Sequence, residues 1–434
     1  MSTSPTASTT AHVPVSAEDR LEHIDLVRGY ALLGVLLVNL HSWFRTPPQR
    51  YFLGRHPYPD AWNMAADYLT SIWFEGKSVT LFSMLFAVGL CIQRERALQK
   101  GVPWNEYALR RLGSMLLFGV LHIVLIWNGD ILHNYALVGF PFLLFLGRER
   151  RTIGIWLSVI FGLAAAGLFG YWVWLLFHQP PTPPTQDKLK EALDWGDACV
   201  RGYTQTSWFQ VLVFRVRDFK RMFLNIGNLG VFSFFTLVNF LIGLYLWKQG
   251  AIRAPRDHLP LLRRVAGWGL GLGLLANVLN AMRPMLRPIF HAHWSWSRFF
   301  MLPLMLSEPV AYQAMALGLG AALIVLWQDP TWKRRLRPIT YVGRMAFTNY
   351  ITQSIVCTTI FYGFGLGLYD KLGPLAGTGI VAAIYGLQIP FSRFWLSRFR
   401  YGPLEWLWRT LTYGSLQPFR RTAPVRVAVE NLAP

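Results

Sequence analysis

The residues best suited to chemistry lie in one short stretch, LHIVLIWNGDILHNYALVG at 121–139. It carries His122, Asp130 and His133 between apolar runs, and WNGD forms a turn signal between the two histidines. A histidine oriented by a carboxylate is the arrangement of a general base. We therefore predict that these three side chains meet in a catalytic group. A buried histidine satisfied by a backbone carbonyl remains an equally good interpretation for His122 alone.

A second set of polar residues lies in the first apolar segment, HIDLVRGYALLGVLLVNLH. Asp25 and Arg28 are three residues apart and can pair on one helix face. Asn39 follows Arg28 by eleven residues, which returns it to nearly the same face about 16 Å along the axis. Polar side chains are costly in a bilayer and usually face the protein interior. Arg28 and Asn39 are predicted to bind substrate, or else to clamp this helix to its neighbours.

Further polar positions accompany later apolar runs. Glu75 and Lys77 precede the run KSVTLFSMLF and form either a substrate-binding pair or a pair that snorkels to the membrane interface. Glu308 stands beside Pro309, and Asn349 and Gln353 are four residues apart. For these later residues we favour hydrogen bonding between helices over the lining of a cavity.

The elements that must position these residues are membrane helices. The 434-residue chain is 53% hydrophobic and 15% charged, against about 25% charged in ordinary soluble domains. A spanning helix needs roughly 20 mostly apolar residues. The fold class predicted is an all-α, polytopic transmembrane helix bundle of about ten spans. The predicted spans are 26–44, 78–95, 110–127, 131–147, 153–177, 229–247, 265–282, 300–327, 339–364 and 375–397.

The formal net charge of +20 has two explanations, a nucleic-acid binder or a membrane protein with positive cytoplasmic loops. Lys and Arg cluster where alternate spans end, at 94–111, 148–151, 248–264 and 333–337, whereas the connection at 128–130 has none. The basic connections and both termini are therefore predicted to be cytoplasmic, with the lipid bilayer as partner and no nucleic acid. Seven Lys/Arg in the 179–226 loop do not fit, but long loops report orientation less well.

The chain is predicted to divide around that long loop. A disordered head (1–20) precedes an N-terminal half of five spans (21–178), whose first span is a retained anchor. An extracytoplasmic loop with an interfacial segment (179–226) leads to a C-terminal half of five spans (227–400) and a basic cytoplasmic tail (401–434). The three cysteines, Cys91, Cys199 and Cys357, form no CxxC and are predicted to be buried small residues, with no metal site.

Several motifs make the chain similar to the YeiB-like family of bacterial integral membrane proteins, whose second half is a domain of unknown function. They are RGYALLGVLLVN, KSVTLFSMLFAVGL, GVLHIVLIWNGDILHNYALVG, VGRMAFTNYITQS and FRYGPLEWLWRTLTY, in this order. The resemblance covers about 20 to 415, and its most specific parts are GDIL…YAL…G and GPLEWLWR at 402–409. It implies a multi-pass protein of the bacterial inner membrane.

That family is distantly similar to transmembrane acyltransferases, including the lysosomal heparan glucosaminide acetyltransferase and bacterial sugar O-acyltransferases. The resemblance implies that an acyl group from cytosolic acyl-CoA, a co-substrate, reaches a small-molecule or glycan acceptor outside. The sugar O-acyltransferases carry an arginine, ten residues and a histidine on their first helix; here Arg28 is followed by Asn39 at that spacing. The base would then be His122, with His133 second and His41 third.

Three functions follow from these observations. In a membrane acyltransferase, Asp130 would orient His122 or His133, and Arg28 and Lys77 would balance negative charge on the donor or the oxyanion. In a small-solute transporter, the same polar residues would line a pathway, with discontinuous helices and inverted repeats expected. In a structural or signalling membrane protein, they would serve only in packing. A homodimer is compatible with each of these functions.

Overall fold

The computed structural model describes residues 20–48, 58–178, 186–223, 226–282 and 302–421, and this described part is almost entirely helical. Its only extended pairing is an isolated antiparallel bridge between Phe399 and Arg420. Seven helical stretches within it are long and apolar enough to cross a membrane. The prediction of an all-α membrane helix bundle is therefore confirmed at this level.

The helices of the first half begin with α1 (Glu22–Asn39), which continues as the π-helix η1 (Leu40–Phe44). There follow α3 (Ala61–Trp73), α4 (Lys77–Gln99), α5 (Trp104–Leu125), α6 (Leu132–Leu146) and α7 (Arg150–Phe177). The region predicted as a loop forms α8 (Gln186–Tyr203) and α9 (Trp208–Phe223). The second half contains α10 (Ile226–Gln249), the 3₁₀ turn η2 (Pro255–His258), α11 (Leu259–Ala281), α14 (Leu302–Trp327), α15 (Pro330–Arg344), α16 (Ala346–Phe361), α17 (Pro374–Arg398) and α18 (Pro403–Tyr413).

The predicted number of ten spans is not reproduced by the seven stretches that meet the length and hydropathy requirement. The other three predicted spans correspond to α6, α11 and the α15–α16 pair, which are shorter or more polar. The predicted span 339–364 is not one helix, because the chain breaks at Met345 between α15 and α16. Glu405 of α18 accepts hydrogen bonds from the Phe347 and Thr348 amides and so caps the start of α16.

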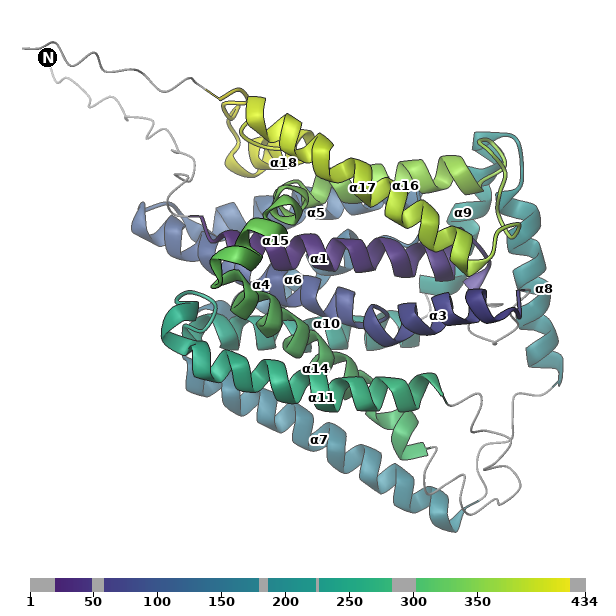
Figure 1. The fold of residues 1–434 in the computed structure, drawn as a ribbon, viewed down its shortest axis with the longest axis horizontal. Helices are drawn as coiled ribbons and strands as arrows, with labels where there is room; N and C mark the ends of the chain where they lie inside the picture. Colours follow the sequence, from purple (N-terminus) through teal and green to yellow (C-terminus); the bar gives the residue numbers. More distant parts are fainter. Residues whose placement is uncertain (1–19, 49–57, 179–185, 224–225, 283–301, 422–434) are drawn as a thin grey trace, which may run out of the picture.

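Helix α1 lies inside the bundle, where it packs against α4, α14, α15, α16 and α17 (Figure 1). The α8–α9 hairpin lies at one end of the bundle, at the right of Figure 1, and α18 lies toward the other end.

Glycines allow the closest helix contact in the second half. A Cβ added at Gly273 would come within 2.7 Å of the Met315 backbone nitrogen, and one at Gly269 within 2.7 Å of the Ala314 carbonyl oxygen. Helices α11 and α14 therefore pack backbone to backbone, as small residues permit in membrane proteins. By contrast, α7 keeps most of its apolar surface exposed, which suits a helix that faces lipid.

Candidate functional site

The sequence-predicted trio comes together at the connection between α5 and α6. The Nδ1 atom of His122 lies 2.8 Å from Oδ1 of Asp130, and Nδ1 of His133 lies 3.0 Å from Oδ2 of the same carboxylate. The His133 backbone amide also donates to Oδ2 at 2.8 Å. All three residues are buried. Asp130 thus holds both imidazoles from the turn that joins their helices.

The contacts of Asp130 with the two histidines also determine whether its carboxyl group is ionised. Burial raises the pKa of Asp130, but the hydrogen bonds and charges of His122 and His133 outweigh it and lower the pKa to about 2. Asp130 is therefore ionised at neutral pH and can only accept hydrogen bonds. In the tautomer that can act as a base, Nδ1 of His122 donates its proton to Asp130, and Nε2 is the ring nitrogen left to accept one.

The Nε2 atom of His122 is buried and has no hydrogen-bond partner in the part of the chain that the structure describes. The imidazole contacts the ring of Tyr350 on α16, with centroids 5.2 Å apart, and that of Trp127 at 6.1 Å. A buried polar atom without a partner is uncommon and calls for an explanation. A role as a base, in which Nε2 accepts a proton from a bound molecule, would explain it.

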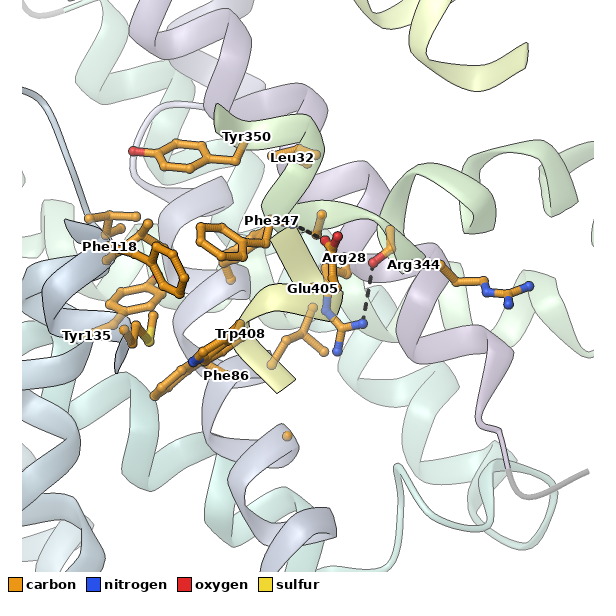
Figure 2. Close-up of a pocket in the computed structure, with 18 of the residues that line it drawn as sticks. Arg28, Leu32, Phe86, Phe118, Tyr135, Arg344, Phe347, Tyr350, Glu405 and Trp408 are labelled. Atoms are coloured by element: carbon orange, nitrogen blue, oxygen red, sulfur yellow. Dashed lines mark hydrogen bonds between the residues drawn. The ribbon is translucent and has the colours of Figure 1, made fainter. Parts of the chain in front are cut away.

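A cavity of about 220 Å³ leads from this region along the bundle (Figure 2). Its walls come from α1, α4, α5, α6, α15, α16 and α18. On α4 the wall extends from Phe82 to Gln93, which corresponds to about 16 Å of helix. Ile131, Tyr135 and Tyr350 line the cavity near the histidines; His122 itself lies behind the wall, in contact with Tyr350.

The opposite end of the cavity is strongly basic. Figure 2 shows Arg28 and Arg344 at the end away from Tyr350, Tyr135 and Phe118. Three further arginines line the cavity: Arg20, Arg111 and Arg409. Between the two ends the walls are mostly apolar and include Leu32, Val35, Phe86, Met115 and Phe347. The cavity therefore suits a molecule with an anionic head and a slender body.

The motif GPLEWLWR builds much of this basic end, a role that sequence reasoning missed. Trp408 stacks over the guanidinium of Arg111, 3.7 Å from its carbon to the ring centroid, and donates from Nε1 to the Arg111 carbonyl oxygen. Glu405 caps α16, and Arg409 lines the cavity. The amphipathic pattern of α18 was visible in the sequence, but the contact with α5, nearly 300 residues away in the chain, was not.

The predicted substrate-binding residues do not all join the site. Arg28 lines the cavity and pairs with Asp25 at 2.7 Å, as their spacing predicted. Asn39 is the last residue of α1 and is not among the lining residues. Glu75 and Lys77 belong to a separate group, in which Lys77 donates to the Ser71 carbonyl oxygen and lies over the Tyr312 ring.

The other candidate residues have structural partners. Both ring nitrogens of His41 are engaged, Nδ1 with Asp67 at 2.9 Å and Nε2 with Thr378 at 3.1 Å, so His41 is a poorer base than His122. Tyr312 donates its hydroxyl to Glu308. Interhelical hydrogen bonding by the polar pair on α16 is confirmed, since Asn349 and Gln353 donate to Ser392 and Gln388 of α17.

The α8–α9 hairpin closes the end of the bundle beside the histidines. Asp218 of α9 is buried and accepts hydrogen bonds from Asn128 of the WNGD turn and from Trp195 and Tyr203 of α8. Phe219 lies edge-on to His133, with centroids 5.7 Å apart. The segment predicted to lie at the interface is thus packed by one face onto the site.

Replacing Asp218 by Asn should loosen this cover. An amide accepts fewer hydrogen bonds than a carboxylate and turns its own N–H donors either toward Trp195 or toward Asn128 and Tyr203. We expect a loss of about 1–3 kcal/mol in the free energy of unfolding. Thermal unfolding of the purified chain measures it, with Asp194→Asn on the exposed face of α8 as control. An Asp218 variant as stable as this control would contradict the assigned role.

Comparison with known proteins places this chain in a family. The model for a protein of unknown function, DUF418, matches residues 246–415. The chain is 32% identical to "Uncharacterized protein YxaH" of Bacillus subtilis (strain 168), over 95% of this chain and 99% of that protein. It is 30% identical to "Uncharacterized protein YeiB" of Escherichia coli (strain K12), over 91% and 97% of the two chains. The histidine site and the arginine-lined cavity are therefore features of a chain that belongs to the YeiB-like family.

Proposed function

We propose that this protein is an acyltransferase of the bacterial inner membrane, which moves an acyl group from cytosolic acyl-CoA to an extracytoplasmic hydroxyl or amine. One observation carries the proposal. A single cavity joins an arginine-lined end to the wall formed by Tyr350, whose ring contacts His122. The arginines would bind the phosphates of coenzyme A, and the narrow apolar part would hold the arm that carries the thioester.

The chemistry assigned to the site is direct transfer. Nε2 of His122 takes the proton from the acceptor O–H or N–H, and the acceptor atom attacks the thioester carbonyl carbon. Collapse of the tetrahedral intermediate breaks the C–S bond, and the coenzyme A thiolate leaves and receives the proton from the imidazolium. Asp130 orients the ring and stabilises its charged form, in the way that a carboxylate supports a catalytic histidine.

Tyr350 lies between the donor cavity and His122. Its ring stands in the cavity wall against His122, so rotation of this side chain would open the cavity to Nε2. Its hydroxyl is a donor available to the developing oxyanion. Arg28 and Arg344 lie at the other end and bind the donor rather than the reacting atoms.

Replacing Arg344 by Gln should weaken donor binding and leave the chemical step intact. Loss of one charged hydrogen-bond donor to a phosphate is expected to raise the KM for acetyl-CoA roughly tenfold, with kcat little changed. Release of the coenzyme A thiol by purified protein measures both constants. Arg334→Gln, on the exposed face of the same helix, is the matched control. Equal KM values for the two variants would show that Arg344 does not contact the donor.

One observation favours a small-solute transporter instead. The break at Met345 between α15 and α16 lies beside the cavity, and interrupted helices commonly line transport pathways. The two functions differ in bond breaking. A transporter would move solute with acyl-CoA intact, whereas the acyltransferase releases free coenzyme A in proportion to the product formed.

A further inference from the structure

Arg215 of α9 has one complete edge of its guanidinium group without a partner. The side chain is fully buried, and Nη1 donates to the Val124 carbonyl oxygen at 2.9 Å. Within the described residues, neither Nε nor Nη2 has a hydrogen-bond partner. These two atoms form the side of an arginine that binds a carboxylate or phosphate through two parallel hydrogen bonds.

The chain does not supply a counter-ion from the nearest possible source. Asp218 follows Arg215 by three residues on the same helix face, a spacing that normally allows an ion pair. Its carboxylate is instead engaged by the neutral donors of Asn128, Trp195 and Tyr203. No salt bridge to Arg215 occurs among the residues that the structure describes.

A purely structural role explains only part of this arrangement. Val124 lies in the last turn of α5, where carbonyl oxygens lack helical partners and a positive charge is favourable. Capping of α5 therefore accounts for Nη1. It does not account for the buried, unpaired Nε–Nη2 edge, since burying a charge without a counter-ion is strongly unfavourable.

Arg215 lies near the two histidines of the proposed reaction. Val124, its partner, is two residues from His122 on α5, and α9 also places Phe219 against His133. The surrounding side chains include Tyr203 and Tyr362, whose rings stack 4.6 Å apart. An arginine beside aromatic rings presents a planar fork of donors that matches a carboxylate or phosphate group.

We propose that the free edge of Arg215 binds a carboxylate or phosphate group of the acceptor, a deduction that rests on the acyltransferase function proposed above. The acceptor class is then an anionic hydroxyl or amine compound rather than a neutral one. The α8–α9 hairpin, which carries Arg215, supplies this contact from the end of the bundle beside the histidines, and Arg215 is not among the residues that line the donor cavity. The bound oxyanion neutralises the buried guanidinium and holds the hairpin closed over the histidines.

The test uses the full chain in detergent, without acyl-CoA, and compares thermal unfolding in inorganic phosphate, acetate and chloride at matched ionic strength. Wild-type protein is expected to be stabilised by phosphate, by acetate or by both, relative to chloride. In Arg215→Met this shift should shrink to the part that the arginines of the donor cavity contribute. Arg215→Lys keeps the charge but not the two-point geometry and should bind the oxyanion about tenfold more weakly. Arg344→Gln, in the donor cavity, should retain the Arg215-dependent shift.

The variants also separate an anion site from a helix cap. If the buried guanidinium awaits an anion, Arg215→Met should melt at a higher temperature than wild type in chloride, because an uncompensated buried charge has been removed. The proposal is overturned if phosphate or acetate raises the unfolding temperature equally in wild type and Arg215→Met. It is also overturned if neither anion raises the unfolding temperature of wild type. This assay contains no acyl donor, so it tests anion binding alone. If the protein shows the Arg215-dependent shift but transfers no acyl group, only the acyltransferase function is refuted.

Discussion

Replacing His122 by Gln is expected to lower the rate of acyl transfer about 10²–10⁴-fold, the range associated with loss of a general base. Glutamine has a similar reach and can still donate a hydrogen bond to Asp130, but it cannot take a proton from the acceptor. The KM for acyl-CoA should change little, because the arginines that bind the donor lie at the other end of the cavity. The measurement is kcat for coenzyme A release, with thermal unfolding as a check on folding.

The site provides its own matched comparison. His133 is bound to the same carboxylate, so His133→Gln makes the same chemical change on the other oxygen of Asp130. We expect a smaller loss of rate there, because the ring of His122 contacts the cavity wall through Tyr350 while that of His133 contacts Phe219 of the hairpin. A folded His122→Gln protein with wild-type turnover would remove His122 from this role, and a larger loss in His133→Gln would transfer the role to His133.

Replacing Gly89 by Leu should block the cavity without damaging the fold. Gly89 lines the cavity on α4, and a Cβ built on it meets no atom within 4 Å, so a leucine side chain would extend into open space. Leucine also favours a helix over glycine by nearly 1 kcal/mol. We expect stability to be retained, and kcat/KM for acetyl-CoA to fall on the order of a hundredfold, as misplacement of a bound substrate does.

Gly162→Leu on α7 is the matched control, because a Cβ there also meets nothing within 4 Å but the position faces outward, away from the cavity. Coenzyme A release should be normal in this variant. If Gly89→Leu binds and consumes acetyl-CoA as well as Gly162→Leu does, the donor does not occupy the cavity. The arginine-lined end would then need another explanation.

Local spacing in the sequence predicted the contacts that depend on one or two neighbouring helices. Asp130 and His133 are three residues apart at a helix start, and Asp25 and Arg28 share one helix face, so periodicity alone brings each pair together. The convergence of His122 on Asp130 followed from the short WNGD turn, because a turn of that length brings the end of one helix beside the start of the next.

Contacts that depend on distant segments could not be predicted in this way. Hydropathy merged α15 and α16 into one span, since the cap that separates them comes from Glu405, about 60 residues later. For the same reason, the contact of Trp408 with Arg111 and that of Asp218 with Asn128 could not be predicted from the sequence. Helical geometry placed Asn39 on the same face of α1 as Arg28, but the α1 residues that line the cavity end at Val35.

The central claim is that the donor enters at the arginine-lined end and reacts beside His122. Inside-out membrane vesicles that contain the protein expose the cytoplasmic face to acetyl-CoA labelled in the acetyl group, and the label recovered in vesicle contents and lipids is then measured. We predict covalent incorporation in wild-type vesicles that is lost in both His122→Gln and Gly89→Leu vesicles and retained in Gly162→Leu vesicles. Equal incorporation in wild-type and His122→Gln vesicles with matched protein levels would contradict the account.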